Sequence, residues 1–524
     1  MTARRSARFA LLVAAVAAAL YANGIPGAFV FDDKLIVRDP RIAGQEPFWR
    51  IFVTDYWYTF PAATRDVYRP LTVASYALNR LLTGASSPWF HAVNVALHAL
   101  VSVLVVLLAE ALLGDRRLAL VAGLLFAAHP VHTEAVTGIV GRAEVLAALF
   151  LLASLLVLAR AGTGRLRGGA AGLALGAYAC ALGSKETALI GPGLVAVADV
   201  VQQMRRGRGA GLGGWQWRRT MVRVGLFAAV AALFVGLRLA ILGRVLLEPP
   251  ETAGRLLHGE PLATRAFTAL QILAIYLRLL LVPLTLSADY SYRQVPVLHA
   301  PNTLAILGGL AACALGAATL WAWWRRARAP LLALGFFLVP YAVASNFPVA
   351  LGVLVAERLL YLPSVGYCLG LAWLLTATSR CLAFRHPAWR RGAEGVLAAV
   401  LLFYAGRTVL RNLDWHTPEA LYAATVRASP ECHTAHYNYA AVLMRDPAND
   451  RLALEHLERA RAIRQDHVPA IILLTRLYLQ LGRFEDALAL TREGLLRAPE
   501  NRELHVLRQR AVSLLRARSE RPGS

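Results

Sequence analysis

The chain has 524 residues, of which 57% are hydrophobic and 17% charged, with a mean hydropathy of +0.50. This composition excludes an ordinary soluble globular domain and predicts a polytopic membrane protein with a polar appendix. The net charge of +23 comes almost entirely from arginine, because the only lysines are Lys34 and Lys185. The arginines gather at the ends of apolar segments, so membrane anchoring explains them and a nucleic-acid partner is not expected. Neither metal-ligand spacing nor a disulfide framework is visible in the cysteines, which are Cys180, Cys313, Cys368, Cys381 and Cys432.

The amino-terminal segment starts with Arg4, Arg5 and Arg8 and continues into an apolar run at residues 9–30. A cleaved signal peptide has a similar basic start and a similarly short run of small apolar residues. The apolar stretch resumes at residues 25–31 after a brief polar break. We therefore expect a retained first span with a cytoplasmic amino terminus.

Twelve apolar runs approach the length that crosses a bilayer, about 20 residues. They are residues 9–30, 90–113, 118–138, 143–160, 168–183, 187–204, 221–241, 266–286, 303–324, 330–347, 351–377 and 393–410. Arginine clusters mark the cytoplasmic ends, and the runs alternate regularly except between Arg219 and Arg325, where three runs join two cytoplasmic clusters. We therefore predict eleven spans, with residues 266–286 broken or re-entrant on the outer side, next to a wet cavity near Asp289 and Tyr290.

This alternation predicts that polar groups far apart in the sequence meet at one outer membrane boundary. The groups are Asp32-Asp33, residues 129–134, Lys185-Glu186, Glu357-Arg358 and the chain after Arg411. Acidic groups are costly near hydrocarbon, so Asp32 and Asp33 either face water or have a chemical role, and the pair alone does not decide between these.

A polar loop at residues 32–88 follows the first span. Its residues 47–58 mix aromatic rings with charges, as a helix lying in the membrane interface does. Simple anchoring by Trp and Tyr explains the same pattern, so both interpretations stay open.

The C-terminal part changes character at about residue 417 and shows a 34-residue period, in which Ala453 corresponds to Ala487. The positions of Tyr478, Gly482 and Phe484 match the tetratricopeptide pattern. We expect two full repeats, preceded by a partial helix at 418–429 and followed by a capping helix at 501–516. The array either presents a modest concave surface or only stabilises the last span.

Eight motifs precede the repeats in a fixed order. They are Phe31-Asp32-Asp33, 68–72 (YRPLT), 90–98 (FHAVNVALH), 129–136 (HPVHTEAV), 141–144 (GRAE), 184–187 (SKET), 357–364 (ERLLYLPS) and 412–415 (NLDW). In this order, and over nearly the whole chain, they resemble the transmembrane and tetratricopeptide repeat-containing proteins. That family is understood as protein O-mannosyltransferases of the GT-C architecture, which take mannose from a dolichyl-phosphate carrier on the luminal side.

The resemblance implies an all-α fold, with a GT-C-like bundle of about eleven spans at residues 1–411. Repeats would occupy residues 412–517, and residues 518–524 would form a disordered tail. The array is shorter than in animal members, and the Arg- and Ala-rich composition indicates a bacterial chain. We therefore expect an inner-membrane protein that uses a shorter polyprenyl-phosphate sugar, with its active face and repeats in the periplasm.

Sugar transfer to a hydroxyl needs a base, cations for the departing phosphate and a dry pocket. Asp32 or Asp33 is the expected general base, and the other would orient a partner. The resemblance places twelve further residues at the donor sugar and its phosphate. They are Arg69, His91, His129, His132, Glu134, Arg142, Glu144, Lys185, Glu186, Glu357, Arg358 and Tyr361. For the neighbours Lys185-Glu186 and Glu357-Arg358, internal ion pairing explains the charges equally well.

A metal site is the alternative reading of His129, His132 and Glu134. Their spacing differs from the His-Glu-x-x-His helix of zinc hydrolases, and Pro130 indicates a turn or a helix start. Asp32 and Asp33 could also recruit a divalent cation beside a phosphate. We expect no metal site and no cofactor beyond the lipid-linked donor.

Three functions remain open from the sequence. The leading one is an inverting hexosyltransferase that modifies Ser or Thr of exported proteins, with the repeats helping to present the acceptor protein. The second is glycosyl transfer to an envelope lipid or glycan. The third is a non-catalytic membrane scaffold, which would need no convergence of ionisable residues on one face.

Overall fold

A computed structural model describes residues 2–59, 67–162, 168–206, 216–243, 257, 259–291, 293–351, 353–385 and 387–519. These residues are helical or irregular and include no strand, so the all-α prediction is confirmed. The chain divides into a membrane unit, residues 1–286 with 297–417, and a repeat unit, residues 287–296 with 418–524. The first unit carries the apolar runs, and the second carries the repeats.

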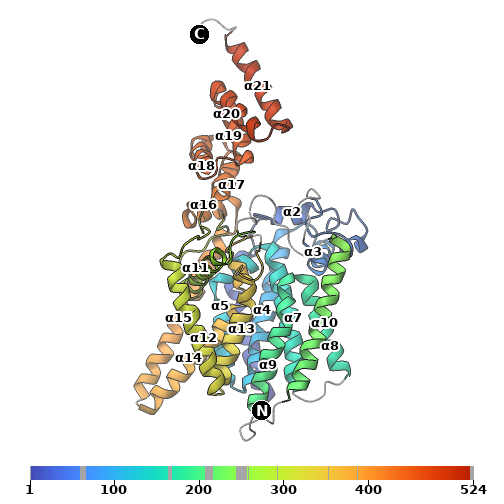
Figure 1. Cartoon of the computed structure of the whole chain (residues 1–524), viewed down its shortest axis with the longest axis vertical. Helices are drawn as coiled ribbons and strands as arrows, with labels where there is room; N and C mark the ends of the chain where they lie inside the picture. The colour runs from blue at the N-terminus through green and yellow to red at the C-terminus, as the bar shows by residue number, and fades with distance from the viewer. Residues whose placement is uncertain are drawn as a thin grey trace. The chain divides into compact units, whose positions relative to one another are not determined.

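Each of the twelve apolar runs corresponds to a helix of the membrane unit (Figure 1). These helices are α1 (Thr2–Tyr21), α4 (Ser87–Leu113), α5 (Arg116–Ala128), α7 (Arg142–Ala161), α8 (Gly168–Ser184), α9 (Gly191–Arg206), α10 (Trp217–Leu242), α11 (Leu262–Leu281), α12 (Thr303–Trp324), α13 (Arg328–Ala344), α14 (Ser364–Arg385) and α15 (Pro387–Asp414). The third run breaks after Ala128 and continues as a 3-10 turn, Pro130–His132, and the short helix α6, Thr133–Val136. The turn expected at Pro130 is therefore present.

Eight described helices are long and apolar enough to cross a membrane, or nine if α5 and α6 form one bent span. This is fewer than the eleven predicted spans, partly because α8 and α13 are apolar but shorter. Close backbone contact holds such helices together: a Cβ atom on Gly366 of α14 would lie 2.2 Å from the backbone nitrogen of Phe337 in α13. Small residues at such crossings let membrane helices pack without voids.

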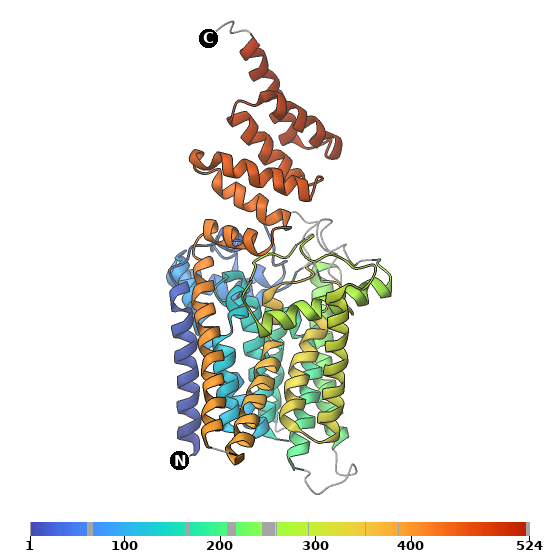
Figure 2. The same ribbon diagram turned by 90° about the vertical axis from the view of Figure 1, so that its left-hand side faces the viewer.

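Helix α11 is continuous rather than broken, and it lies across the other helices instead of alongside them (Figure 2). Two of its backbone carbonyls accept hydrogen bonds from neighbouring helices. Tyr341, near the end of α13, donates to the carbonyl of Ala269 at 3.1 Å. Tyr404 of α15 donates to the carbonyl of Leu280 at 2.8 Å. The geometry agrees with the prediction that this segment does not cross, although its composition alone would allow a span.

The loop after α1 contains α2 (Asp33–Arg38), a 3-10 turn (Phe48–Phe52) and α3 (Pro70–Thr83). The interfacial helix suggested at residues 47–58 is therefore wrong in extent, because only five residues are helical there. Helix α3 is the amphipathic one, with Leu81 and Leu82 81% and 72% exposed on one face and Tyr76 buried on the other. This helix was not predicted from the sequence, because the aromatic residues at 47–58 were taken as the sign of a helix in the membrane interface.

Helices α16 to α21 form the repeat unit. They are α16 (Pro418–Ala428), α17 (His433–Leu443), α18 (Asp450–Ile463), α19 (Val468–Gln480), α20 (Phe484–Arg497) and α21 (Arg502–Ser519). Helix α15 continues to Asp414, past the expected boundary at 411, and α21 includes Arg518 and Ser519 of the expected disordered tail. Residues 520–524 lie outside the described part of the chain.

Residues 287–296 belong to the repeat unit. Asp289 accepts a hydrogen bond from Thr434 at 2.5 Å, and Ser429 donates to Ser287 at 2.8 Å. Tyr290 is buried. The wet cavity expected near Asp289 and Tyr290 stays a prediction.

Candidate functional site

The acidic loop, residues 29–34, has an unusual backbone. Phe31 has a φ of 50°, a left-handed conformation that residues other than glycine seldom adopt. Such strain persists where the surroundings hold it, and it clusters at functional sites. Asp33 supplies the restraint: its Oδ2 accepts from the N–H of Val30 at 3.3 Å, and its Oδ1 accepts from the N–H of Val140 at 3.0 Å. Asp33 thus ties the loop to the turn that starts α7.

The two aspartates differ in access. Asp33 is 2% exposed, and burial raises its pKa to about 7, against the opposing effect of its bonds from Val140 and Val30. Asp32 precedes α2 and keeps part of its surface exposed. Of the adjacent pair, Asp32 is the carboxylate that a ligand can reach.

Three ion pairs connect the sequence motifs to one another. They are Arg69–Glu186, Lys185–Glu144 and Arg358–Glu134. The first is a two-pronged contact with N–O distances of 2.5 and 3.0 Å. Lys185 pairs with Glu144 rather than with its neighbour Glu186, so the pairing of adjacent residues that the sequence left open is wrong there. Each pair instead joins two segments far apart in the chain.

The charges of these three pairs and of Asp32 interact with one another. Arg358 interacts with Glu134, Asp32 and Glu144, and Lys185 interacts with Glu144, Arg69 and Arg358, among others. Burial lowers the pKa of Lys185, and the Glu144 carboxylate opposes that effect. The predicted convergence of distant charges is therefore present in the membrane unit. We call Asp32, Asp33 and the three ion pairs the charged cluster.

Two tyrosines that the sequence did not single out support the charged cluster. The guanidinium of Arg69 lies 5.3 Å from the centre of the Tyr56 ring, and Tyr56 is electrostatically coupled to Asp32. Tyr276 of α11 accepts a hydrogen bond from the N–H of Ala356 at 3.2 Å, next to the segment with Arg358. The aromatic stretch at 47–58 was the only sequence signal for Tyr56, and none pointed to Tyr276.

Comparison with known proteins identifies the family. A tetratricopeptide-repeat model matches residues 451–511. Human protein O-mannosyl-transferase TMTC1 is 31% identical over 505 residues, which cover 88% of this chain and 56% of the human protein. Human TMTC4 is 31% identical over 495 residues, covering 85% and 65%, and Drosophila melanogaster Tmtc3 is 30% identical over 536 residues, covering 89% and 56%. The chain belongs to the TMTC family.

This TMTC-family chain spans between 56% and 65% of the length of these relatives. Among solved structures, the Archaeoglobus fulgidus oligosaccharyltransferase matches with a TM-score of 0.40 and 14% identity, covering 86% of this chain and 58% of that one. A score this low does not establish a shared fold.

Arg142 of this TMTC-family chain is enclosed by protein acceptors. Its Nε donates to Asn94 at 2.6 Å, its Nη2 donates to Asn79 at 2.8 Å and to the carbonyl of Phe90 at 2.9 Å, and its Nη1 donates to the carbonyl of Ser75 at 3.3 Å. The side chain is fully buried. This geometry favours a structural role over phosphate binding for Arg142.

The histidines of the motif at 129–136 are also held by protein groups. The Nε2 of His129 faces the carbonyl of Leu280 at 3.0 Å, and the Nε2 of His132 faces the hydroxyl of Ser364 at 2.7 Å. Both rings are fully buried. Within the described ranges, no three His, Cys, Asp or Glu side chains are arranged to hold a metal ion. Glu134 alone of this motif's candidates joins the charged cluster.

The other predicted donor-binding residues lie in the interior. The Tyr361 hydroxyl and the Nδ1 of His98 are 2.8 Å apart in the packed core. His91 is 1% exposed and packs against Gly27, where an added Cβ would lie 3.3 Å from its Nε2. It therefore supports the chain just before the acidic loop. Glu357, next to Arg358, is fully buried.

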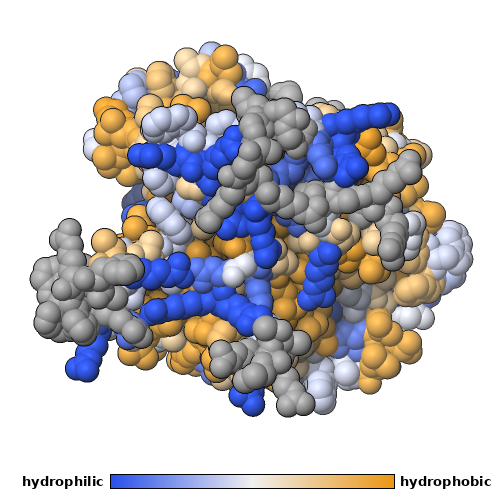
Figure 3. Space-filling model, turned by 90° about the horizontal axis from the view of Figure 1, so that it is seen from below, coloured by the Kyte–Doolittle hydropathy of each residue, from blue (hydrophilic) through white to orange (hydrophobic). Residues whose placement is uncertain are grey.

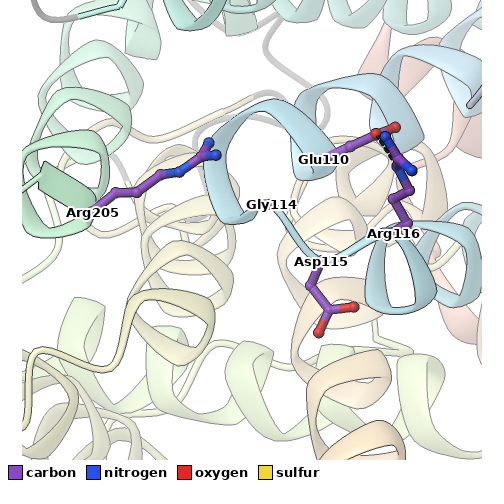
Figure 4. Close-up of a pocket in the computed structure, with 5 residues that line it drawn as sticks. All are labelled: Glu110, Gly114, Asp115, Arg116 and Arg205. Atoms are coloured by element: carbon purple, nitrogen blue, oxygen red, sulfur yellow. Dashed lines mark hydrogen bonds and ion pairs between the residues drawn. The ribbon is translucent and has the colours of Figure 1, made fainter. Parts of the chain in front are cut away.

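The end of the membrane unit that lies opposite the charged cluster presents hydrophilic side chains between apolar ones (Figure 3). A cavity of about 520 Å³ there is lined by Glu110, Gly114, Asp115, Arg116 and Arg205 (Figure 4). Its charges are satisfied within the protein. Arg116 pairs with Glu110 at 2.7 Å, Asp115 pairs with Arg380, and Arg205 donates to the carbonyl of Ala111 at 2.9 Å. The charged cluster is the better candidate site, because its ion pairs join residues of five of the sequence motifs.

Proposed function

We propose that this chain is a membrane glycosyltransferase that moves a sugar, mannose, from a polyprenyl-phosphate carrier to Ser or Thr hydroxyls of exported proteins. The observation that carries the proposal is the set of three ion pairs that bring five distant segments together beside Asp32. The relatives' printed names, protein O-mannosyl-transferases, support the same chemistry. A scaffold needs no such buried convergence of charge.

In the proposed reaction, the acceptor hydroxyl oxygen attacks the anomeric carbon as its bond to the phosphate oxygen breaks. The bonding electrons leave with the phosphate, and the hydroxyl proton passes to the Asp32 carboxylate. One displacement on the face opposite the leaving group inverts the anomeric configuration. Asp33 positions Asp32 through its two backbone hydrogen bonds. General-base help of this kind contributes about 10²–10⁴-fold to rate.

Arg358 is the proposed phosphate contact. Its side chain is 30% exposed, against 13% for Arg69 and 6% for Lys185. A guanidinium can hold a phosphate with two parallel hydrogen bonds. Arg69 and Lys185 would then stabilise the phosphate by their positive charge, without touching it, and would maintain the shape of the site.

The proposed location is a bacterial inner membrane, with the amino terminus in the cytoplasm and the charged cluster outside. This orientation is supported by arginines at the helix ends far from the charged cluster, such as Arg116, Arg117 and Arg325. The donor lipid, the bilayer and an exported acceptor protein are the proposed partners.

The test is transfer of radiolabelled mannose from polyprenyl-phosphate mannose to peptides containing Ser and Thr, using the purified full chain in liposomes. Asp32→Asn should lower kcat by about 10²–10⁴-fold. Asp115→Asn, the same change at the opposite end, should leave transfer unchanged. Mass spectrometry of exported proteins from cells with and without the gene identifies the acceptor. No transfer by the wild type, or full activity of Asp32→Asn, would contradict the proposal.

A further inference from the structure

The repeat unit contains a groove between α19 and α21. Its volume is about 500 Å³, and its lining residues are Arg476, Leu479, Gln480, Glu503, Val506, Leu507 and Arg510. Ligand pockets in proteins usually measure about 300–1,000 Å³. The groove lies within the tetratricopeptide match at 451–511. It is therefore large enough for part of a peptide.

Two helix faces make the walls of the groove. On α21, residues 503, 506, 507 and 510 follow the spacing of one helical face, and residues 476, 479 and 480 do the same on α19. The floor is apolar, because Leu479 and Leu507 are only 8% and 6% exposed there. Val506, at the rim, leaves 60% of its surface in solvent. An apolar side chain of a ligand would cover Val506.

The charges of the groove are unbalanced toward positive. Arg476 is ion-paired with Glu503, and Gln480 donates to Asp450 at 3.0 Å. Arg510 lines the groove and makes no side-chain hydrogen bond or ion pair with any described residue. Helix α21 has five arginines and one glutamate. A ligand of complementary charge is therefore acidic.

We propose that this groove binds an extended acidic segment of a protein, with an apolar side chain on Val506 and a carboxylate on Arg510. Helical grooves commonly take peptides through such apolar anchors, with charges at the rim adding selectivity. The identification of the bound protein as the sugar acceptor rests on the function proposed above. The groove would then select acceptors that carry acidic residues at a distance from the modified hydroxyl.

The test measures fluorescence anisotropy of a short fluorescein-labelled peptide built from Asp, Ser and Leu, with the full chain in detergent and no sugar donor present. Arg510→Glu should weaken binding by about tenfold or more, because it reverses the charge at the proposed carboxylate contact. Val506→Ser should weaken it too, by removing the apolar contact. Arg451→Glu is the matched control, because Arg451 lies on α18 with a 95% exposed side chain.

Equal binding of a peptide with Lys in place of Asp, or equal effects of Arg510→Glu and Arg451→Glu, would overturn the proposal. So would an absence of peptide binding, including the case where vesicles of anionic phospholipid bind through Arg510 instead. Asp32→Asn should leave peptide binding intact. Peptide binding without mannose transfer would thus reject the proposed enzyme and support the proposed groove. Mannose transfer without peptide binding would support the enzyme and reject the groove.

Discussion

The charged cluster and the repeat unit both contain ion pairs, but the pairs differ in burial and in the sequence separation of the residues that they join. In the cluster, the Lys185 and Glu144 side chains are 6% and 5% exposed and join segments 41 residues apart. In the repeat unit, Arg459 and Glu431 are 49% and 45% exposed and join neighbouring parts of the array. Burying charge is costly, so breaking a cluster pair should cost more stability than breaking an exposed pair. The same kind of ion pair thus forms a buried cluster in one region and a solvated surface in the other.

The largest expected effect on stability comes from breaking a cluster pair. Glu144→Gln removes the carboxylate that is hydrogen-bonded to the buried Lys185 amine and should cost about 3–5 kcal/mol of unfolding free energy. Thermal unfolding of the purified chain in detergent measures it. The double variant Glu144→Gln with Lys185→Met should recover part of the loss, because no charge is left unpaired. A negligible effect of the single variant would show that water reaches this pair.

The next effect separates the two aspartates. Asp33→Asn cannot accept from both Val30 and Val140, because its amide nitrogen is a donor, and it should lose about 1–3 kcal/mol. Asp32→Asn should lower the unfolding temperature less than Asp33→Asn does, while it lowers kcat by about 10²–10⁴-fold. The two variants are compared by thermal unfolding and by the liposome assay. A reversed pattern would exchange the roles of the two residues.

The repeat unit should be sensitive to acid. Burial lowers the pKa of His433 to about 3 and that of His467 to about 4, and their rings are 4.7 Å apart. Unfolded histidine titrates near about pH 6.5. Stability from these neutral rings is therefore complete above that pH and is lost as the pH falls below it, by on the order of 1 kcal/mol.

Hydrogen exchange of the full chain, corrected for intrinsic rates, measures that loss in α17 and α19 between pH 7 and pH 5. Replacing His467 by Gln should flatten the dependence. Unchanged protection in the wild type across this range would contradict the assignment.

The smallest effect is expected from an exposed repeat-unit pair. Glu431→Gln removes the partner of Arg459 and should change the unfolding free energy by only about 0–1 kcal/mol. The effect should shrink further in high salt, because exposed charges are screened. Thermal unfolding at low and high salt measures both. A cost equal to that of Glu144→Gln would remove the distinction between the two regions.

Much of this organisation could be predicted from the sequence, because hydropathy and helical period are local. The twelve apolar runs, the break at Pro130 and the repeats at 451–511 all follow from local patterns. The convergence of the charged motifs at one membrane boundary could be predicted by counting the membrane spans between them. The partners within the cluster could not be predicted, because Glu144–Lys185 and Glu134–Arg358 depend on how the helix ends are rotated. Buried residues such as Arg142 and His132 also look functional in sequence, since interior hydrogen bonding leaves no local signal.

Helix α11 has a consequence for how a lipid could reach the cluster. It lies across the bundle while its bonds fasten it to α13 and α15. Separating those two helices would require either the loss of these bonds or a shift of α11 as a whole. Leu262 and Leu281, near its two ends, are 68% and 58% exposed. The helix therefore covers part of the bundle end, and the lipid tail of the donor proposed above would have to pass beside it.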